Sequence, residues 1–361
     1  MGLLSIYEKL VSVDSISGSE SKVKEIIGQY LRSYPLREDN KGNIIIGIAG
    51  EGTPLLLNAH LDRVPPGKAH TPMIKGDIVY SDKDKTTNSG ADDVVGIAII
   101  ISLLEKIKEE KHRALKIIFT VEEEVGLFGA KAIEEKDLKG CEEGIILDNA
   151  FSYKLHSEGG VLVGKGAAIY SFDLEIFGRA GHSGKDLSLT LNVLTLWREL
   201  GLDFGSLDDD SIRINVGSLV VGEGKVRNKI PDKLIAYGEI RSLLDEAKTK
   251  IFINDFKKNI TEKVGTSKGS CNLNVNKLAD AYFVDMSSNL LKKYQGVLHN
   301  RGVQIKSYPT YIGSDCQVFR TKGIECFTLS TGVDNEHTAN EEFSIKYAEQ
   351  IIDDLVNLVK L

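Results

Sequence analysis

The sequence predicts an α/β fold in which a mostly parallel central sheet is flanked by helices and interrupted by an inserted α+β domain. Over about the first 150 residues, short apolar strands alternate with helices, which is typical of a parallel sheet. From about Ala167 the strands alternate apolar and polar residues, as strands with one solvated face do. Near Ser287 the first pattern returns. We therefore expect one domain made of residues 1–166 and 284–361, and an inserted lid or dimerisation domain at residues 167–283.

Length and composition are those of a folded globular protein. The 361 residues suggest about two domains, and the apolar fraction of 42% is ordinary. The formal charge is −7 and no long basic run occurs, so we expect no nucleic-acid partner. The opening segment has Glu8 and Lys9 among its apolar positions, unlike a signal peptide, and no later segment has the length of a membrane span. We expect a cytoplasmic protein with no membrane partner.

Apolar spacing predicts the elements of the first domain. Helical spacing indicates three helices, and Ser17 or Ser19 can cap the second of them. Short runs rich in Ile and Leu indicate buried strands. The predicted helices are 3–11, 20–31 and 94–108, and the predicted strands are 43–49, 54–59, 115–121 and 144–147.

The remaining elements are predicted in the same way. Alternating strands with a helix between them indicate the insert, and a helix followed by two strands returns the chain to the first domain. The predicted strands are 169–177, 234–240, 271–276, 303–307 and 326–330, and the predicted helices are 188–200 and 289–297.

The first polar pair of interest ends a predicted buried strand. His60 and Asp62 stand two residues apart, and the period of a strand places both on one side. The imidazole can bind a metal through one nitrogen while Asp62 holds the other nitrogen. Alone, this spacing is more typical of a structural histidine.

Two further acidic groups make a metal site more specific. Asp92 and Asp93 precede the helix at 94–108, where an N-cap would explain them equally well. The strand at 115–121 ends in three adjacent carboxylates, Glu122-Glu123-Glu124, which would repel one another unless a cation lay nearby.

The carboxyl ends of parallel strands meet at one edge of a sheet, where open α/β sheets bind ligands. Asp148 follows the strand at 144–147, and His337 lies downstream of the strand at 326–330. Oxygen and imidazole donors without thiolate are typical of catalytic zinc, and the four scattered cysteines form no C-x-x-C pair. A carboxylate shared between metals suits a two-metal hydrolase. Five ligand-type residues are expected to converge: His60, Asp92, Glu124, Asp148 and His337.

These residues belong to a series of motifs that resembles the dizinc metallopeptidase superfamily of aminoacylase, carboxypeptidase G and peptidase T. The similarity is greatest to the peptidase T branch. It spans residues 58 to 338, and the motifs in order are NAHLD, GADD, EEEVG, LDN, GHSG, NKIP with EIRS, IGSD, and EHT. The resemblance implies a peptidase that cleaves small peptides, in the manner of an aminopeptidase, with two zinc ions per chain. Cobalt or manganese can substitute at such sites.

The resemblance also implies a role for each motif residue. Glu123 would be the general base that takes a proton from the metal-bridging water, and Asp62 would orient His60. The implied ligands form two sets joined by one bridging carboxylate: His60 with Asp148, Glu124 with His337, and the shared Asp92.

The inserted domain corresponds to the lid of that family. His182 matches the lid histidine, which is thought to stabilise the oxyanion, and Asn228 and Arg241 match residues that hold the substrate's backbone or carboxylate. Because the lid histidine of many relatives reaches a neighbouring subunit, the resemblance implies a homodimer formed through the lid. The loop of Gly313, Ser314 and Asp315 resembles a substrate-side loop.

Two positions depart from the family pattern. Val94 stands where relatives often carry Lys, which removes no ligand. The sequence from Ile312 to Cys316 reads I-G-S-D-C where peptidase T usually has G-G-T-D-G, so tripeptide specificity is not simply inherited. Deacylation of N-acyl amino acids or carboxypeptidase action by the same mechanism is the alternative. An inactive peptide-binding relative is a further alternative, but Glu123 and every implied ligand are present.

Overall fold

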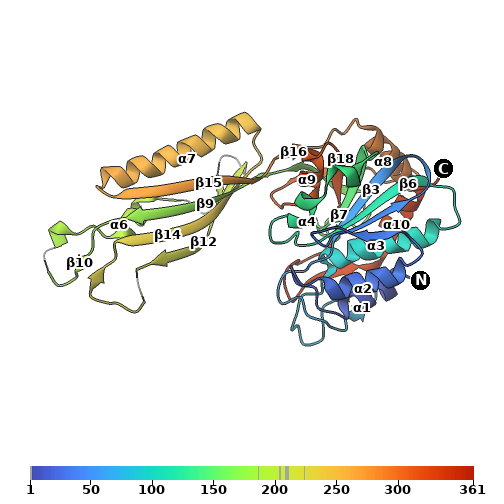
Figure 1. The fold of residues 1–361 in the computed structure, drawn as a ribbon, viewed down its shortest axis with the longest axis horizontal. Coiled ribbons are helices and arrows are strands. Elements are labelled where there is room, and N and C mark those ends of the chain that lie inside the picture. Colours follow the sequence, from blue (N-terminus) through green and yellow to red (C-terminus); the bar gives the residue numbers. More distant parts are fainter. Residues whose placement is uncertain (1, 186, 203–204, 208–210, 223) are drawn as a thin grey trace. The chain divides into compact units, whose positions relative to one another are not determined.

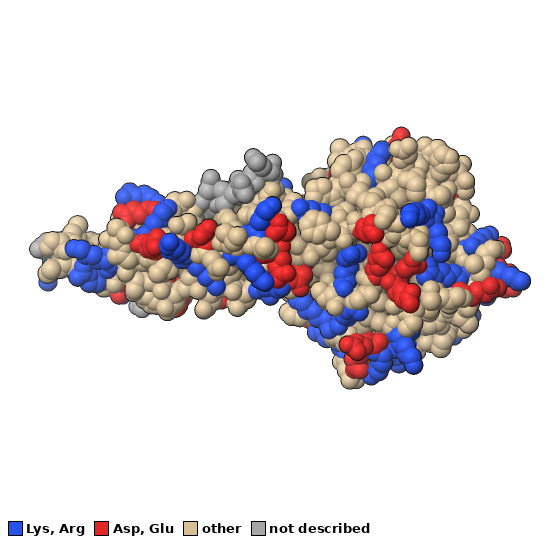
Figure 2. Space-filling view, turned by 90° about the horizontal axis from the view of Figure 1, so that it is seen from above, with Lys and Arg blue, Asp and Glu red and all other residues tan. Residues whose placement is uncertain are grey.

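The computed structural model describes residues 2–185, 187–202, 205–207, 211–222 and 224–361. The chain divides into two compact units. The larger unit comprises Met1–Lys165 and Phe283–Leu361, and the inserted unit comprises Gly166–Tyr282. On the face drawn in Figure 2, basic and acidic side chains intermingle over each unit. Among the described residues, no helix combines the length and apolarity that a bilayer span requires.

The larger unit is organised around a mixed sheet whose centre is parallel (Figure 1). Strands β6, β3, β7 and β18 run parallel to one another, whereas β1, β2 and β8 pair antiparallel at the sides. The predicted mostly parallel sheet is therefore confirmed. The strands, in spatial order, are β1 (Leu36–Glu38), β2 (Ile44–Ile48), β6 (Arg113–Thr120), β3 (Glu51–His60), β7 (Glu143–Asp148), β18 (Glu325–Ser330), β8 (Val161–Gly166) and β16 (Tyr282–Phe283), with β17 (Lys306–Thr310) paired to β8.

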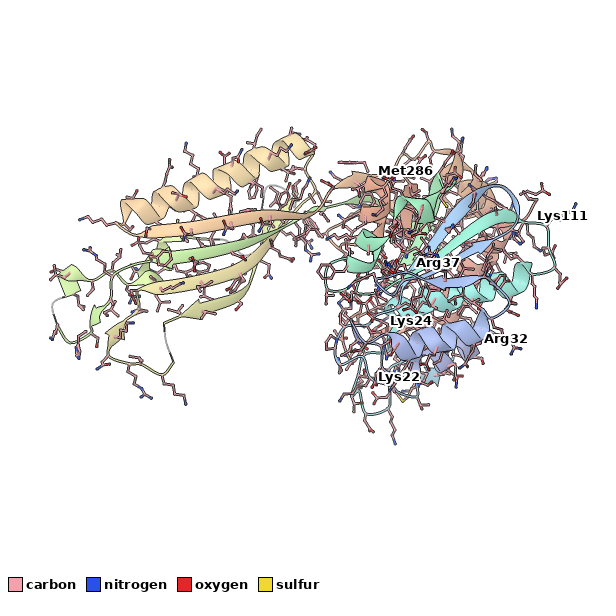
Figure 3. All side chains as sticks on the ribbon, in the orientation of Figure 1. Lys22, Lys24, Arg32, Arg37, Lys111 and Met286 are labelled. Atoms are coloured by element: carbon pink, nitrogen blue, oxygen red, sulfur yellow. The ribbon has the colours of Figure 1, made fainter. Side chains whose placement is uncertain are left out.

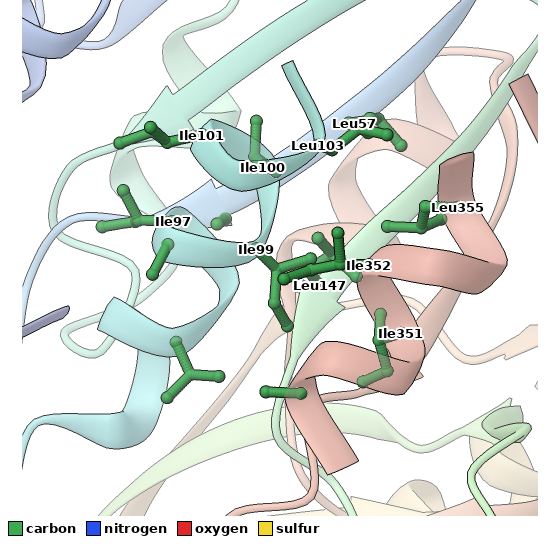
Figure 4. Close-up of a cluster of buried hydrophobic side chains, with 14 of the residues drawn as sticks. Leu57, Ile97, Ile99, Ile100, Ile101, Leu103, Leu147, Ile351, Ile352 and Leu355 are labelled. Atoms are coloured by element: carbon green, nitrogen blue, oxygen red, sulfur yellow. The ribbon is translucent and has the colours of Figure 1, made fainter. Parts of the chain in front are cut away.

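Helices cover both faces of this sheet (Figure 1). One face packs on a single apolar core, in which Ile99 of α3 and Ile352 of α10 lie beside Leu147 of the sheet (Figure 4). Helix α3 is buried along almost its whole length. The helices of this core are α1 (Leu3–Val11), α2 (Ser21–Tyr30), α3 (Ala91–Ile107), α8 (Asn289–His299) and α10 (Ile345–Val359). The other helices are α4 (Phe128–Ala132), α5 (Glu135–Leu138) and α9 (Asp315–Thr321), and α9 packs on β7 and β18.

Smaller elements complete the larger unit. A three-stranded sheet joins β19 (Glu342–Ser344), β5 (Ile78–Tyr80) and β4 (Met73–Lys75). Ion pairs at the surface link neighbouring elements: Lys24 of α2 pairs with Glu38 of β1, and Arg37 of β1 pairs with Asp137 of α5 (Lys24 and Arg37 are labelled in Figure 3).

The inserted unit is an antiparallel sheet with two helices, in agreement with the predicted α+β insert. Its core lies between sheet and helices, where Phe172 meets Phe256 with ring centroids 5.5 Å apart. The strands, in spatial order, are β11 (Gly205–Leu207), β12 (Ile212–Val221), β14 (Lys233–Ser242), β9 (Ala168–Phe177) and β15 (Ser270–Ala279). The helices are α6 (Val193–Leu200) and α7 (Glu246–Thr266), a short 3-10 helix spans Leu187–Leu189, and β10 (Gly181–His182) pairs with β13 (Lys229–Ile230).

Several local predictions differ from the structure. The prediction that Ser17 or Ser19 caps α2 was wrong, because Glu20 occupies the N-cap position without a side-chain hydrogen bond. The predicted helix at 188–200 becomes regular only at Val193, where the Asn192 side chain accepts a hydrogen bond from the backbone of Leu194. The strand predicted at 303–307 begins at Lys306. Helices α7 and α10 lie outside the predicted elements.

Candidate metal centre

Three segments that carry ligand-type residues follow the parallel strands. β3 ends at His60, β7 ends at Asp148, and Glu123 and Glu124 come shortly after the end of β6 at Thr120. Because these strands are parallel neighbours, their carboxyl ends lie at one edge of the sheet. The parallel sheet thus brings the segments that carry His60, Glu124 and Asp148 to the same edge, as predicted.

Asp92 lies between two histidines. Its Oδ1 atom is 3.2 Å from His60 Nε2, and its Oδ2 atom is 3.2 Å from His337 Nε2. On one side, Asp148 Oδ1 lies 3.8 Å from the same His60 nitrogen, and on the other, Glu124 Oε1 lies 2.8 Å from the same His337 nitrogen. Each histidine therefore has one further carboxylate next to it, Asp148 beside His60 and Glu124 beside His337. The Asp92 carboxylate lies next to both histidines.

The Glu124 carboxylate lies beside His337. Its Oε1 atom is buried and forms an ion pair with His337 Nε2 at 2.8 Å. Ligand atoms of Glu124, His60 and Asp92 also lie within 4.8 Å of one another. A cation bound among these clustered atoms would offset the charge of the carboxylates, and the oxygen and imidazole donor set suits zinc.

Asp62 fixes the two segments that it touches. Its carboxylate accepts hydrogen bonds from the backbone N–H groups of Glu123 and Glu124, at 2.9 and 3.2 Å, and from the Ser17 hydroxyl at 2.6 Å. His60 Nδ1 is 2.9 Å from the Asp62 carbonyl oxygen and 3.5 Å from its carboxylate. The imidazole is thus held mainly through the backbone of Asp62, while the carboxylate holds the strand end that bears the two glutamates.

The site concentrates buried negative charge. Burial raises the pKa of Asp148 well above its usual range, and the charge of Asp92 raises it further. Burial likewise raises the pKa of Glu123, with a contribution from Asp148. Contacts with the carboxylates of Asp92 and Glu124 raise the pKa of His337 to about 11. Since divalent cations favour ionised carboxylates and neutral imidazoles, these residues fit a site for such ions.

Two acidic residues outside the predicted ligand set also hold the site together. Asp93 Oδ2 accepts a hydrogen bond from the backbone N–H of His60 at 3.1 Å, and its Oδ1 accepts one from Gly96 in α3 at 3.2 Å. Glu341 Oε1 accepts a hydrogen bond from the backbone N–H of Asp92 at 2.9 Å. The GADD motif contains Asp93, whereas no strand-end pattern marks Glu341.

The model of peptidase family M20/M25/M40 matches residues 56–361. The chain belongs to this family. It is therefore a peptidase, and the resemblance that the motifs indicated is confirmed.

Solved structures of similar proteins share the fold over almost the whole chain. A tripeptidase from Staphylococcus aureus subsp. aureus Mu50 is 24% identical with a TM-score of 0.90, covering 99% of this chain and 97% of that chain. Aminopeptidase PepT from Bacillus cereus ATCC 10987 is 23% identical with a TM-score of 0.87 and the same coverage. YxeP from Bacillus subtilis, a dinuclear metal-binding peptidase of the M20 family, is 15% identical with a TM-score of 0.71, covering 99% and 96%. At these identities the likeness establishes the shared M20 fold.

The predicted substrate-side loop of this M20 chain is largely buried. The Ser314 hydroxyl lies 2.8 Å from the hydroxyl of Thr328 in β18. Asp315 is buried and accepts a hydrogen bond from Thr120, and burial raises its pKa to about 6. Gly313 is partly exposed, and Val94, which replaces the usual Lys, is a buried residue of α3. Asp315 therefore lies beside the end of β6, where its charge contributes to the raised pKa values of Glu123 and Asp148.

The predicted lid residues all lie on the inserted unit. His182 is an exposed residue of β10, and its Nδ1 accepts a hydrogen bond from the backbone of Gly184 at 3.1 Å. Asn228 is exposed next to β13. Arg241 of β14 donates to both carboxylate oxygens of Glu239, at 2.9 and 3.1 Å. The structure thus places these side chains in the unit that contains none of the predicted metal ligands.

Proposed function

We propose that this M20 peptidase is a two-zinc enzyme that hydrolyses the amide bonds of di- and tripeptides in the manner of an aminopeptidase. The observation that carries the proposal is the position of Asp92, whose two oxygens each lie 3.2 Å from a different histidine. A carboxylate placed in this way is suited to bridge two cations.

The ligand sets follow from the same contacts. His60 and Asp148 would hold one ion, and His337 and Glu124 the other. Bound zinc ions polarise a carbonyl and lower the pKa of water, which makes a protein nucleophile unnecessary. The clustering of ligand atoms of Glu124, His60 and Asp92 within 4.8 Å of one another supports the role of Glu124 as a ligand.

Glu123 is the residue best suited to serve as general base. It is buried, and its carboxylate interacts electrostatically with His60 and Asp148 of the predicted ligand set. Its backbone N–H is held by Asp62, which fixes the position from which the side chain extends. In the proposed reaction, the Glu123 carboxylate takes a proton from the attacking water and returns it to the leaving amine.

The substrate class rests on two supports. The tripeptidase and the aminopeptidase described above match this chain over nearly its whole length. The inserted unit supplies an exposed imidazole at His182, an exposed amide at Asn228 and a guanidinium at Arg241. We assign His182 to the oxyanion, and we assign the other two to the backbone or carboxylate of the peptide.

A substrate screen tests this proposal. The zinc-loaded protein should release amino-terminal residues from di- and tripeptides, and it should lose this activity on treatment with a chelator and regain it on addition of zinc. N-acyl amino acids and carboxypeptidase substrates are the comparison set. Faster turnover of either comparison class would replace our substrate assignment, and full turnover by the metal-free protein would contradict the two-zinc mechanism.

We also propose that the protein acts in the cytoplasm.

We further propose that the chain forms a homodimer through the inserted unit. Among the described residues, β12 pairs with β11 only at Ile212–Leu207, Arg213–Ser206 and Ile214–Gly205. Farther along this side strand, Leu219 and Val220 are 42% and 50% exposed. Exposed apolar edge strands are prone to pair with another chain. Light scattering should show a dimer that Leu219→Lys converts to a monomer, and a monomeric wild-type protein would contradict the assignment.

A further inference from the structure

Glu341 connects two ligand-bearing segments that are far apart in the sequence. Its Oε1 atom accepts a hydrogen bond from the backbone N–H of Asp92 at 2.9 Å, and the side chain is only 1% exposed. The backbone N–H of Glu341 donates to the carbonyl oxygen of Thr338, at 3.2 Å, in the turn that follows His337. The residue therefore joins the turn of one histidine to the backbone of the shared carboxylate.

The backbone of Asp92 needs this partner. Asp92 lies at the start of α3 with φ −88° and ψ 106°, which are not helical values. The first N–H groups of a helix have no intrahelical acceptor, and a buried N–H without a partner is costly. Glu341 supplies the acceptor, and in doing so it fixes the peptide group from which the Asp92 side chain extends.

A buried arginine lies in the same region. Arg63 is fully buried, and its guanidinium donates to Ser15 Oγ at 2.8 Å and to the carbonyl oxygens of Val13 and Gly67 at 2.8 and 2.7 Å. Its Nη1 atom has no hydrogen-bond partner. Arg63 interacts electrostatically with Glu341, although burial raises the pKa of Glu341 to about 8. What Asp92 needs from position 341 is an acceptor oxygen, which an amide can also provide.

We propose that Glu341 is a positioning residue of the metal centre, which holds the Asp92 backbone so that each carboxylate oxygen faces one histidine. The inference rests on the proposed two-zinc function. Glu341 contacts the backbone of Asp92 and is not among the predicted ligands. It acts through a hydrogen bond to the Asp92 backbone. Removing the Glu341 side chain should therefore lower the metal affinity while the metal ligands themselves stay the same.

Zinc affinity of the full chain, measured by competition with a chromogenic chelator, tests this role. Glu341→Ala removes the acceptor, and we expect zinc affinity to fall by about 10- to 100-fold, as is typical when a partner behind a metal ligand is lost. Glu341→Gln keeps an acceptor oxygen and should stay close to wild type. Glu342→Ala is a matched control, because this neighbouring buried carboxylate binds Tyr153 at 2.9 Å and Lys154 at 2.6 Å instead of Asp92.

The outcomes separate this inference from the function on which it rests. A wild-type protein that binds no zinc would contradict the proposed function itself. If wild type binds two zinc ions and Glu341→Ala binds them as tightly as Glu342→Ala does, the positioning role is wrong. It is also wrong if Glu341→Gln loses as much affinity as Glu341→Ala. Should Glu341→Ala fail to fold, Glu341→Asp replaces it. The aspartate side chain is shorter and reaches the Asp92 N–H less well, so this variant should bind zinc more weakly than Glu341→Gln does. Equal zinc affinities of the two variants would overturn the inference.

Discussion

The strand ends of the larger unit and the surface of the inserted unit hold their functional residues in different ways. His60 and Asp148 are buried at the ends of parallel strands. His182 and Asn228 are exposed, and Arg241 is engaged by a neighbouring glutamate on its own strand. The parallel sheet brings metal-type ligands together within one unit, whereas the insert carries the side chains that we propose for peptide binding. Changes at the strand ends should therefore affect chemistry or metal content, and changes in the insert should affect substrate handling while the metals stay bound.

The largest effect is expected at Glu123. Glu123→Gln keeps the size of the side chain but removes the base, so turnover should fall by about two to four orders of magnitude while zinc stays bound. Glu124→Gln should instead weaken one zinc, because an amide oxygen is a poorer ligand than a carboxylate. Metal content and rate are measured side by side for both variants.

The opposite pattern would exchange the two assignments. If Glu123→Gln loses zinc while Glu124→Gln keeps both ions and loses only turnover, then the residue near His337 is the base. The 2.8 Å separation between Glu124 and His337 predicts that this will not be observed.

Removing the insert sharpens the comparison further. Deleting residues 167–283 and joining the ends should leave a folded protein that binds zinc, because the larger unit has its own apolar core and contains every predicted ligand. Turnover should fall by at least about 100-fold, the usual cost of losing an oxyanion donor. Zinc content, circular dichroism and rate test this together. Near-normal turnover would remove the role assigned to His182, Asn228 and Arg241.

A smaller effect is expected at Arg241. Arg241→Ala should raise KM by about tenfold, which corresponds to the lower end of the contribution of a charge-assisted hydrogen bond, about 1.5 kcal/mol, and zinc content should be unchanged. Glu239→Gln is the matched control, because it weakens the hold on Arg241 without removing the guanidinium. An unchanged KM in Arg241→Ala would show that the peptide is recognised elsewhere.

Most of the ligand-type residues were predictable because they lie next to a recognisable strand or helix signal, before a helix for Asp92 and after a strand for His60, Glu124 and Asp148. The apolar runs before His60 and Asp148 indicate buried strands, and parallel pairing then brings their ends together. Glu341 has no such signal. Its contact with Asp92 joins residues 249 positions apart, and only the folded chain shows that the N–H of Asp92 needs an acceptor.

Local predictions failed where tertiary contacts compete with local ones. Ser17 has the residue type of a helix cap, but its hydroxyl donates to Asp62, which is buried at the site. Helix α7 was not evident in the sequence because most of its residues are polar. Its buried side is a narrow series of five residues, which needs the insert sheet as a partner: Thr249, Ile253, Phe256, Ile260 and Val264.

Zinc stoichiometry of wild type and of Asp92→Ala, measured by native mass spectrometry, tests the central claim most directly. Because Asp92 faces both histidines, the wild-type chain should carry two zinc ions and the variant should lose both or bind both weakly. Asp148→Ala is the comparison, since it removes a carboxylate from one side only and should leave one ion. A wild-type chain with a single zinc ion, or an Asp92→Ala chain that keeps two, would contradict the bridging role of Asp92.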